Sequence, residues 1–235
     1  MPADQTASPA EIFARCAAMD ASLPEQLAAF WNATAGRSPA FATEVESLVA
    51  RLKEYDVGAG SPRPGEPMPP FALPDTTGRI LDLDSLLAEG PAVVVFHRGH
   101  WCPFCRMSSL ALGRAQQRIE DLGGRMVAIL PDRQPYAGAL RDFSGCNFPF
   151  LTDPENGYAL TLNLVFWVGE PMARLIAGIG NDVPRYQGND SWLLPIPATF
   201  VVGRDGLVVA RFLDPDYRTR FTIEELIAAV ARAAG

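Results

Sequence analysis

The chain has 235 residues but only four cysteines, too few for a scaffold held together by disulfides. It also lacks any cluster of lysine and arginine, and its formal net charge is −7 with a sequence pI near 4.9. Because binding to phosphate groups relies on clustered positive charge, nucleic acids and anionic membrane surfaces are disfavoured as partners. The hydrophobic content of 48% is that of an ordinary globular protein.

Long hydrophobic segments are missing as well. The longest apolar run, residues 92–96, is far shorter than the roughly 20 residues that span a bilayer. The first thirty residues lack the basic start and apolar centre of a secretory signal, and Asp4 and Glu11 stand where that signal would be positive. We therefore expect a cytoplasmic protein.

Three regions can be separated by composition. Residues 1–57 carry apolar side chains at helical spacing and predict two or three amphipathic helices, one of them with Ser38 as its cap and Pro39 in its first turn. Residues 58–70 are rich in proline and glycine and predict a linker. Residues 71–235 alternate between strand and helix patterns, which predicts an α/β domain.

Within the α/β region, several elements have distinct local signals. The apolar run 91–98 is typical of a strand buried on both faces, and Thr222 with Glu225 predicts a capping box for a last helix. Asp84 is the expected cap of a short helix through residue 88. The other predicted elements are a helix over 102–122, a strand over 126–130, a helix over 135–143 and a hairpin joining strands 196–202 and 207–212.

The most informative motif is Trp101-Cys102-Pro103-Phe104-Cys105, which follows the buried strand directly. If Cys102 is the helix cap and Pro103 takes the first helical position, the free amides and the helix dipole favour thiolate over thiol. Residues three apart lie on one helical face, within the distance that a disulfide needs. The pattern therefore predicts a dithiol that closes and reopens.

Four segments of the chain form a recognisable pattern. They are FHRGHWCPFC at 96–105, FPFLTDP at 148–154, DSWLLPIPATFVVGRDG at 190–206 and DPDYRTR at 214–220. With them the chain, from about residue 67 to the end, resembles the peroxiredoxin-like members of the alkyl hydroperoxide reductase and thiol-specific antioxidant (AhpC/TSA) family. The resemblance implies a thioredoxin-like fold, a central mixed sheet flanked by helices, behind a helical N-terminal extension.

The resemblance also implies roles for single residues. Peroxiredoxins use the pattern P-x-x-x-T-x-x-C, whose last cysteine attacks peroxide; ending it on Cys105 places Arg98 at the proline position and Cys102 at the threonine position. The distant arginine of the family aligns with Pro197. Thioredoxins instead face their CxxC with a cis-proline, a place that the Ile196-Pro197 bond suits. The predicted site thus combines a peroxiredoxin-like frame with thioredoxin-like parts.

Three functions stay open at this point. In the favoured one, Cys105 attacks a hydroperoxide, Cys102 condenses with the sulfenic acid, and an external thioredoxin-like dithiol reduces the disulfide. In the second, Cys102, the more exposed cap position, attacks a protein disulfide and Cys105 resolves the mixed disulfide. The third is a non-enzymatic redox sensor or a zinc-binding protein that uses His97 or His100 beside the cysteines. No nucleotide, haem or flavin motif is visible, so no cofactor is expected.

Supporting residues have two readings each. Arg98 either raises the positive potential at the thiols or pairs with a surface acid. Trp101 either forms a rim over the sulfurs or packs, and Thr199 either faces the site or alternates into the sheet. Cys146 is either a distal resolving thiol or a packed residue, and Cys16 is expected to pack. The N-terminal helices either cover the domain or also form a homodimer interface.

Overall fold

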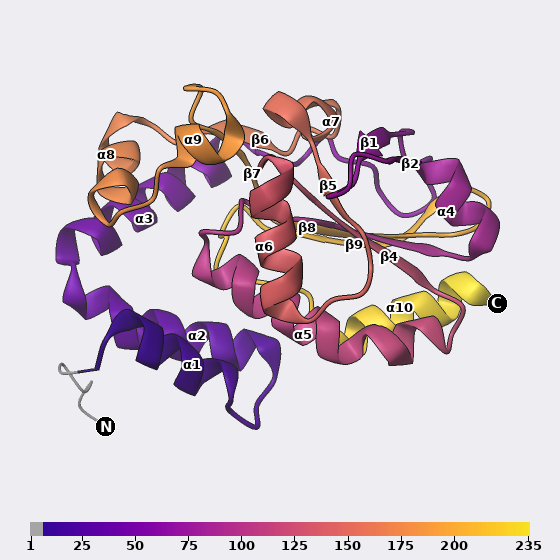
Figure 1. The fold of residues 1–235 in the computed structure, drawn as a ribbon, viewed down its shortest axis with the longest axis horizontal. Coiled ribbons are helices and arrows are strands. Elements are labelled where there is room, and N and C mark those ends of the chain that lie inside the picture. Colours follow the sequence, from indigo (N-terminus) through magenta and orange to yellow (C-terminus); the bar gives the residue numbers. More distant parts are fainter. Residues whose placement is uncertain (1–6) are drawn as a thin grey trace.

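The computed structural model describes residues 7–235 and has an α/β fold built on a central five-stranded sheet (Figure 1). The strand order is β5-β4-β3-β8-β9; β3, β4 and β5 run parallel, whereas β8 is antiparallel to both of its neighbours. The mixed sheet expected from the sequence is thus confirmed. The strands are β3 (Ala92–Phe96), β4 (Arg125–Leu130), β5 (Phe150–Thr152), β8 (Ala198–Val202) and β9 (Val208–Leu213).

Helices cover both faces of this sheet. Val93 and Val95 of β3 pack with α5 (Pro103–Glu120), α6 (Gln134–Ser144) and α10 (Ile223–Ala234). Val94 and Phe96 point to the other face, because successive side chains of a strand alternate. Burial on both faces is the reason why this strand reads as a continuous apolar run. Thr222 caps α10 in the predicted capping box with Glu225.

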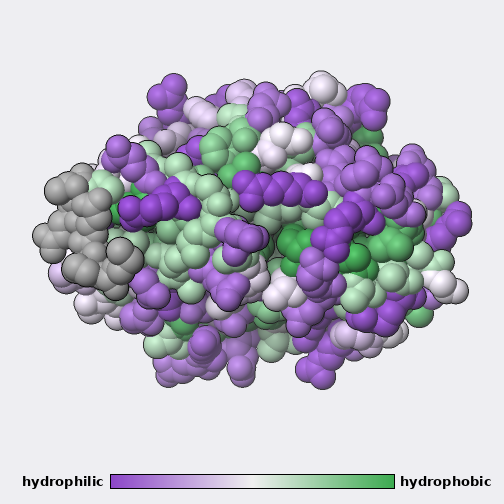
Figure 2. All heavy atoms as spheres, turned by 90° about the horizontal axis from the view of Figure 1, so that it is seen from below, coloured by the Kyte–Doolittle hydropathy of each residue, from purple (hydrophilic) through white to green (hydrophobic). Residues whose placement is uncertain are grey.

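The N-terminal part is helical, with Ser38 capping α3 and Pro39 in the first turn as predicted. Figure 1 shows α1 and α2 beside α5, while α3 continues towards α8. Viewed from below, hydrophilic side chains spread over the surface and hydrophobic ones gather in small areas between them (Figure 2). Within residues 7–235, no helix is long and apolar enough to cross a membrane. The elements are α1 (Pro9–Ala17), α2 (Leu23–Thr34), η1 (Ala35–Arg37) and α3 (Pro39–Glu54).

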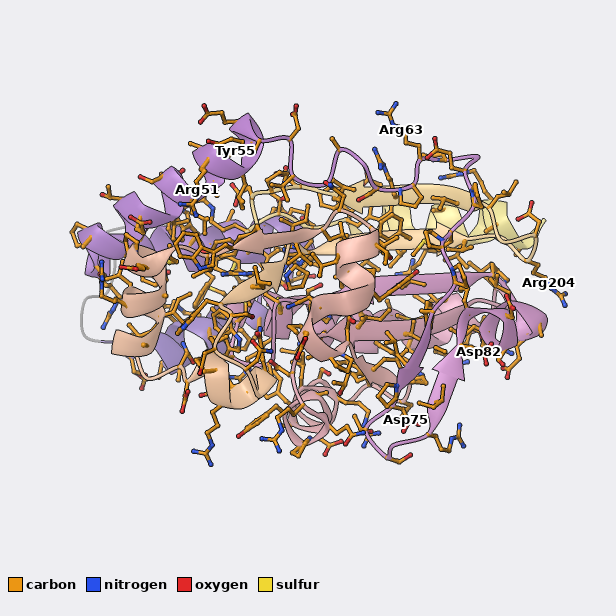
Figure 3. All side chains as sticks on the ribbon, turned by 90° about the horizontal axis from the view of Figure 1, so that it is seen from above. Arg51, Tyr55, Arg63, Asp75, Asp82 and Arg204 are labelled. Atoms are coloured by element: carbon orange, nitrogen blue, oxygen red, sulfur yellow. The ribbon has the colours of Figure 1, made fainter. Side chains whose placement is uncertain are left out.

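A short antiparallel ribbon, β1 (Ala72–Pro74) and β2 (Ile80–Asp82), leads into α4 (Leu83–Glu89). Here the sequence prediction was wrong about the cap. Asp82, labelled in Figure 3, accepts a hydrogen bond from the Ser85 amide at 2.8 Å, whereas Asp84 lies inside the first turn. The helix therefore begins directly at the end of the strand, without an intervening loop.

Between β5 and β8, a segment of short helices and strands (residues 154–195) connects the N-terminal helices to the sheet. Arg51 of α3, labelled in Figure 3, donates hydrogen bonds to the carbonyl oxygens of Trp167 at 3.3 Å and Val168 at 3.0 Å. These two hydrogen bonds fasten α3 to the end of a two-stranded antiparallel ribbon. The elements of this segment are η2 (Pro154–Asn156), α7 (Gly157–Thr161), β6 (Val165–Trp167), α8 (Glu170–Gly178), α9 (Val183–Gln187) and β7 (Leu193–Pro195).

Candidate redox site at the start of helix α5

The turn between β3 and α5 places the two cysteines of the motif. Cys102 is the cap of α5, and Pro103 takes the first helical position, as the sequence predicted. The Cys102 amide donates to the Gly99 carbonyl at 3.2 Å, which closes the turn. Gly99 has a φ of 149°, and a Cβ there would lie 2.4 Å from the Trp101 indole nitrogen and 3.0 Å from an Asp132 carboxylate oxygen. Only glycine fits this close approach.

Both sulfurs are buried: Cys102 is 1% exposed and Cys105 is 0% exposed. The expectation that Cys102 stands open to solvent was wrong, because the N-terminal helices and α8 enclose the start of α5. The two thiols still differ in access. Cys102 lines an apolar cavity of about 310 Å³, and Cys105 is not among the lining residues. A small molecule in this cavity would meet Cys102 first.

Two buried arginines supply positive charge to the pair. Arg98 is 2% exposed, and its Nη1 lies 3.8 Å from the Cys102 sulfur. Its guanidinium stacks on the Tyr217 ring, 3.8 Å from the ring centroid. Of the two readings of Arg98, the structure shows the one in which it faces the thiols. Arg220 approaches from the C-terminal side, with Nη2 3.5 Å from the Cys105 sulfur.

Cys105 receives a second donor from the backbone. The Arg98 amide donates to the Cys105 sulfur at 3.4 Å. The side chain of Arg220 is held in place by its own Nη1, which donates to the carbonyl oxygens of Tyr217 and Thr219. Both sulfurs therefore face fixed donors, which is the arrangement that stabilises thiolates.

The pair carries its negative charge on Cys102. Burial disfavours this thiolate, but the hydrogen bond from the Cys105 thiol, the charges of Arg98 and Arg220, and the Cys105 amide together lower the pKa of Cys102 to about 5. Burial raises the pKa of Cys105 well above its ordinary value, and the hydrogen bond to Cys102 and the negative charge of Cys102 add to that effect. Near neutral pH the geometry thus favours a Cys102 thiolate and a Cys105 thiol.

The remaining predicted supporting residues divide into two groups. Trp101 is half-buried, lines the cavity and has the Arg98 guanidinium 5.2 Å from its ring centroid. Pro197 is buried between β7 and β8, and the expected cis bond before it is absent, since every described peptide bond in residues 7–235 is trans.

Thr199 alternates into the sheet. Its neighbours Ala198 and Phe200 belong to the core cluster that holds both thiols, so strand alternation turns Thr199 to the opposite face with Val201. Among the described side chains, no hydrogen bond joins Thr199 to either sulfur. The reading of Thr199 as a residue that faces the site is therefore wrong.

The two histidines are engaged elsewhere. His97 is buried, its Nε2 lies 3.1 Å from the Ser109 hydroxyl, and burial followed by the Arg220 charge lowers its pKa to about 3. His100 places Nδ1 2.8 Å from the buried carboxylate of Asp132. In the part of the chain from residue 7 onward, no group of three or more histidine, cysteine, aspartate and glutamate side chains is arranged to hold a metal ion.

The other two cysteines are packed residues. Cys146 is buried and its sulfur contacts the Ser109 carbonyl at 3.4 Å, and burial raises its pKa. Cys16 lies in the core formed by the N-terminal helices, as the apolar stripe predicted.

Sequence reasoning missed Arg220 and Tyr217 as site residues. Both lie in the segment DPDYRTR, which carried part of the family resemblance, and Arg220 supplies a cation from far along the chain. A search for the missing distant arginine in every charged segment, rather than in one aligned register, could have found it.

Comparisons with known proteins place the chain among similar sequences and folds. A family model described as "AhpC/TSA family" matches residues 64–211. A Mycobacterium tuberculosis protein named as a candidate peroxiredoxin is 26% identical over 150 residues, which cover 63% of this chain and 84% of that protein.

Solved structures show the same fold. The peroxidoxin BcpB of Mycobacterium tuberculosis has a TM-score of 0.56 at 19% identity, covering 73% of this chain and 97% of that one. Peroxiredoxin Q of Xanthomonas campestris has a TM-score of 0.53 at 14% identity, covering 70% of this chain and 92% of that one. At these identities the likeness concerns the fold.

Proposed function

Since the chain belongs to the AhpC/TSA family, and is thereby a thiol-dependent oxidoreductase, we propose that it reduces hydroperoxides with Cys102 as the attacking thiolate and Cys105 as the resolving thiol. One observation carries the proposal: the cysteine that borders the cavity is also the one with the lowered pKa. This assignment reverses the order that the family register implies. The register aligns positions along the chain, whereas reactivity depends on access and charge.

In the first step the Cys102 thiolate attacks the terminal oxygen of the hydroperoxide. A sulfur–oxygen bond forms as the oxygen–oxygen bond breaks, the sulfur is oxidised by two electrons, and the alkoxide takes up a proton to leave as alcohol or water. Arg98 stands beside Cys102, where its guanidinium can stabilise the negative charge that moves onto the leaving oxygen.

The second step requires Cys105 to become a nucleophile, and the charge of Cys102 controls when it does. While Cys102 is a thiolate, its charge and its hydrogen bond help to keep the pKa of Cys105 high. Once Cys102 is a neutral sulfenic acid, burial still raises the pKa of Cys105, but the effects of the Cys102 charge and its hydrogen bond are lost, and the charges of Arg220 and Arg98 still lower it. Cys105 then attacks the Cys102 sulfur, a disulfide forms, and hydroxide leaves with a proton as water.

In the third step an external dithiol of the thioredoxin type reduces the disulfide. It attacks Cys102, and Cys105 leaves as a thiolate. The Arg98 amide and Arg220 Nη2 already point at the Cys105 sulfur and so stabilise the leaving group. External electrons enter only in this third step, from a dithiol, so the cycle needs no cofactor.

Reduction of protein disulfides is the alternative, and one observation weighs against it. The peptide bond before Pro197 is trans, so the site lacks the cis-proline that faces the CxxC in thioredoxins. Turnover of insulin disulfides without peroxide turnover would favour this alternative.

Trapping of sulfenic acid tests the assignment of roles. After hydrogen peroxide treatment with a sulfenate-specific probe, Cys105→Ser should carry the label at Cys102, because no resolving thiol remains. Cys102→Ser should carry almost none at Cys105. Cys146→Ser, a buried cysteine outside the site, is the matched control and should form the 102–105 disulfide like the natural protein. A label only at Cys105 of Cys102→Ser would reverse the two roles.

A further inference from the structure

Building on the proposed function, we propose that helices α2 and α3 form a specificity wall that selects hydroperoxides carrying an apolar organic group over hydrogen peroxide. The wall consists of Phe30, Trp31, Thr34 and Phe41, which line the cavity in front of Cys102. These residues lie outside the segment 64–211 that matches the family model. The wall is therefore built from a part of the chain that precedes the matched family domain.

The chemistry of the cavity indicates what it accepts. Its lining is almost wholly apolar and contains no acidic side chain. Ile176 of α8 and Ile179, which directly follows that helix, also line it. Of its two cations, Arg98 faces the thiols and Arg37 is exposed at the edge. Hydrogen peroxide would exchange its hydrogen bonds with water for apolar contacts, which is unfavourable. An apolar group would gain from the same contacts.

The size of the cavity sets the scale of that group. An apolar cavity of about 150 Å³ binds benzene, and the cavity here measures about 310 Å³. It has room for a benzene-sized ring together with its branches and the peroxide oxygens. A cumyl group fits this description, so cumene hydroperoxide is a suitable probe.

The wall is held firmly against the reacting sulfurs. The rings of Phe30 and Phe104 meet edge to face at 5.5 Å, and Phe104 meets Tyr217 in the same way at 5.5 Å. Tyr217 in turn lies under the Arg98 guanidinium. A continuous aromatic contact therefore runs from α2 to the cation beside Cys102.

A second contact fastens the same helices to the segment that carries Arg220. Arg218 forms an ion pair with Glu46 of α3 and lies over the Trp31 ring, 4.4 Å from its centroid. Since α2 is held at both contacts and α3 at the second, the cavity is preformed, and its shape can discriminate between substrates.

The test compares kcat/KM for cumene hydroperoxide and for hydrogen peroxide, in the full chain with a dithiol reductant. The natural protein should prefer cumene hydroperoxide. Thr34→Leu adds bulk inside the cavity and should lower the ratio of the two kcat/KM values by about tenfold or more, the scale on which hydrophobic pockets discriminate. Thr43→Leu, the same change at an exposed position of α3, is the matched control and should leave the ratio unchanged.

Phe41→Ala provides a second variant, because it removes part of the wall instead of filling the cavity. It should also lower the ratio, since the organic group loses contacts that hydrogen peroxide never makes. A natural protein that turns over both peroxides without preference, or a ratio unmoved by both variants, would overturn the specificity wall. A natural protein that turns over neither peroxide would overturn the proposed function itself.

Discussion

Removing the charge of Arg98 should raise the pKa of Cys102, so that a smaller fraction of this cysteine is thiolate. Arg98→Met keeps an apolar stem against Tyr217 but deletes the guanidinium that lies 3.8 Å from the Cys102 sulfur. A cation at such a distance shifts a pKa by about 1 to 3 units. The pKa of Cys102, lowered to about 5 in the natural protein, should therefore rise to about 6 to 8 in the variant.

The effect is largest in mildly acidic solution. For a pKa of about 5, roughly nine tenths of Cys102 is thiolate at about pH 6; in the variant this fraction falls to between about one half and one hundredth. Because only thiolate attacks peroxide, the second-order rate of sulfenate formation should fall by the same factor. The rate can be followed by stopped-flow fluorescence of Trp101, which lines the same cavity.

The pH profile decides the matter. The natural protein should lose activity as the pH falls through about 5, and the variant should show the same loss at a pH at least about one unit higher. Arg106→Met is the control, because Arg106 lies on α5 over the Phe143 ring, 3.9 Å from its centroid. Equal midpoints in Arg98→Met and the natural protein would refute the electrostatic role of Arg98.

Two further predictions concern stability. Gly99→Ala should lower the free energy of unfolding by about 1 to 3 kcal/mol, because a Cβ there would meet Trp101 and strain the backbone. Gly178→Ala in α8 is the control, since it has free space around it and should be neutral or stabilising. Urea denaturation compares the two variants, and an equal loss of stability in both would contradict the close approach at Gly99. The reduced protein should gain stability as the pH rises from about 5 to about 8.5, because the unfolded state binds more protons than the folded state in this window. Cys102→Ser should weaken this pH dependence of the free energy of unfolding. If the pH dependence is the same in Cys102→Ser, it arises from other groups.

The sequence predicted those parts of the fold whose signals are local. The strand at Ala92–Phe96, the cap at Ser38 and the capping box at Thr222 each depend on a few neighbouring residues, and all three were confirmed. The cap of α4 was missed because Asp82 and Asp84 are both good caps, and only the end of β2 decides between them. The segment 154–195 consists of short elements that distant residues such as Arg51 hold in place. No local sequence pattern reveals such contacts.

The candidate site likewise has features that follow from neighbouring residues and features that depend on distant ones. The position of Cys102 and Cys105 at the start of a helix follows from five consecutive residues. The burial of Cys102 depends on helices more than sixty residues earlier in the chain, and the charge beside Cys105 comes from Arg220, 115 residues later. Alignment to one family pattern assigned the attacking role to Cys105 from its position in the chain alone, and it placed the distant arginine at Pro197, so neither the cavity nor Arg220 entered that assignment.

The charge balance of the site also bears on how the disulfide is reduced. Arg98 and Arg220 are both buried, and the ion pairs formed within residues 7–235 leave both without a carboxylate partner. In the dithiol state the Cys102 thiolate offsets part of this positive charge, whereas the disulfide offsets none. Buried charge without a partner is costly, so the reduced state is the more stabilised of the two. Stabilisation of the reduced state makes a disulfide a stronger oxidant, and the 102–105 disulfide should therefore accept electrons readily from an external dithiol.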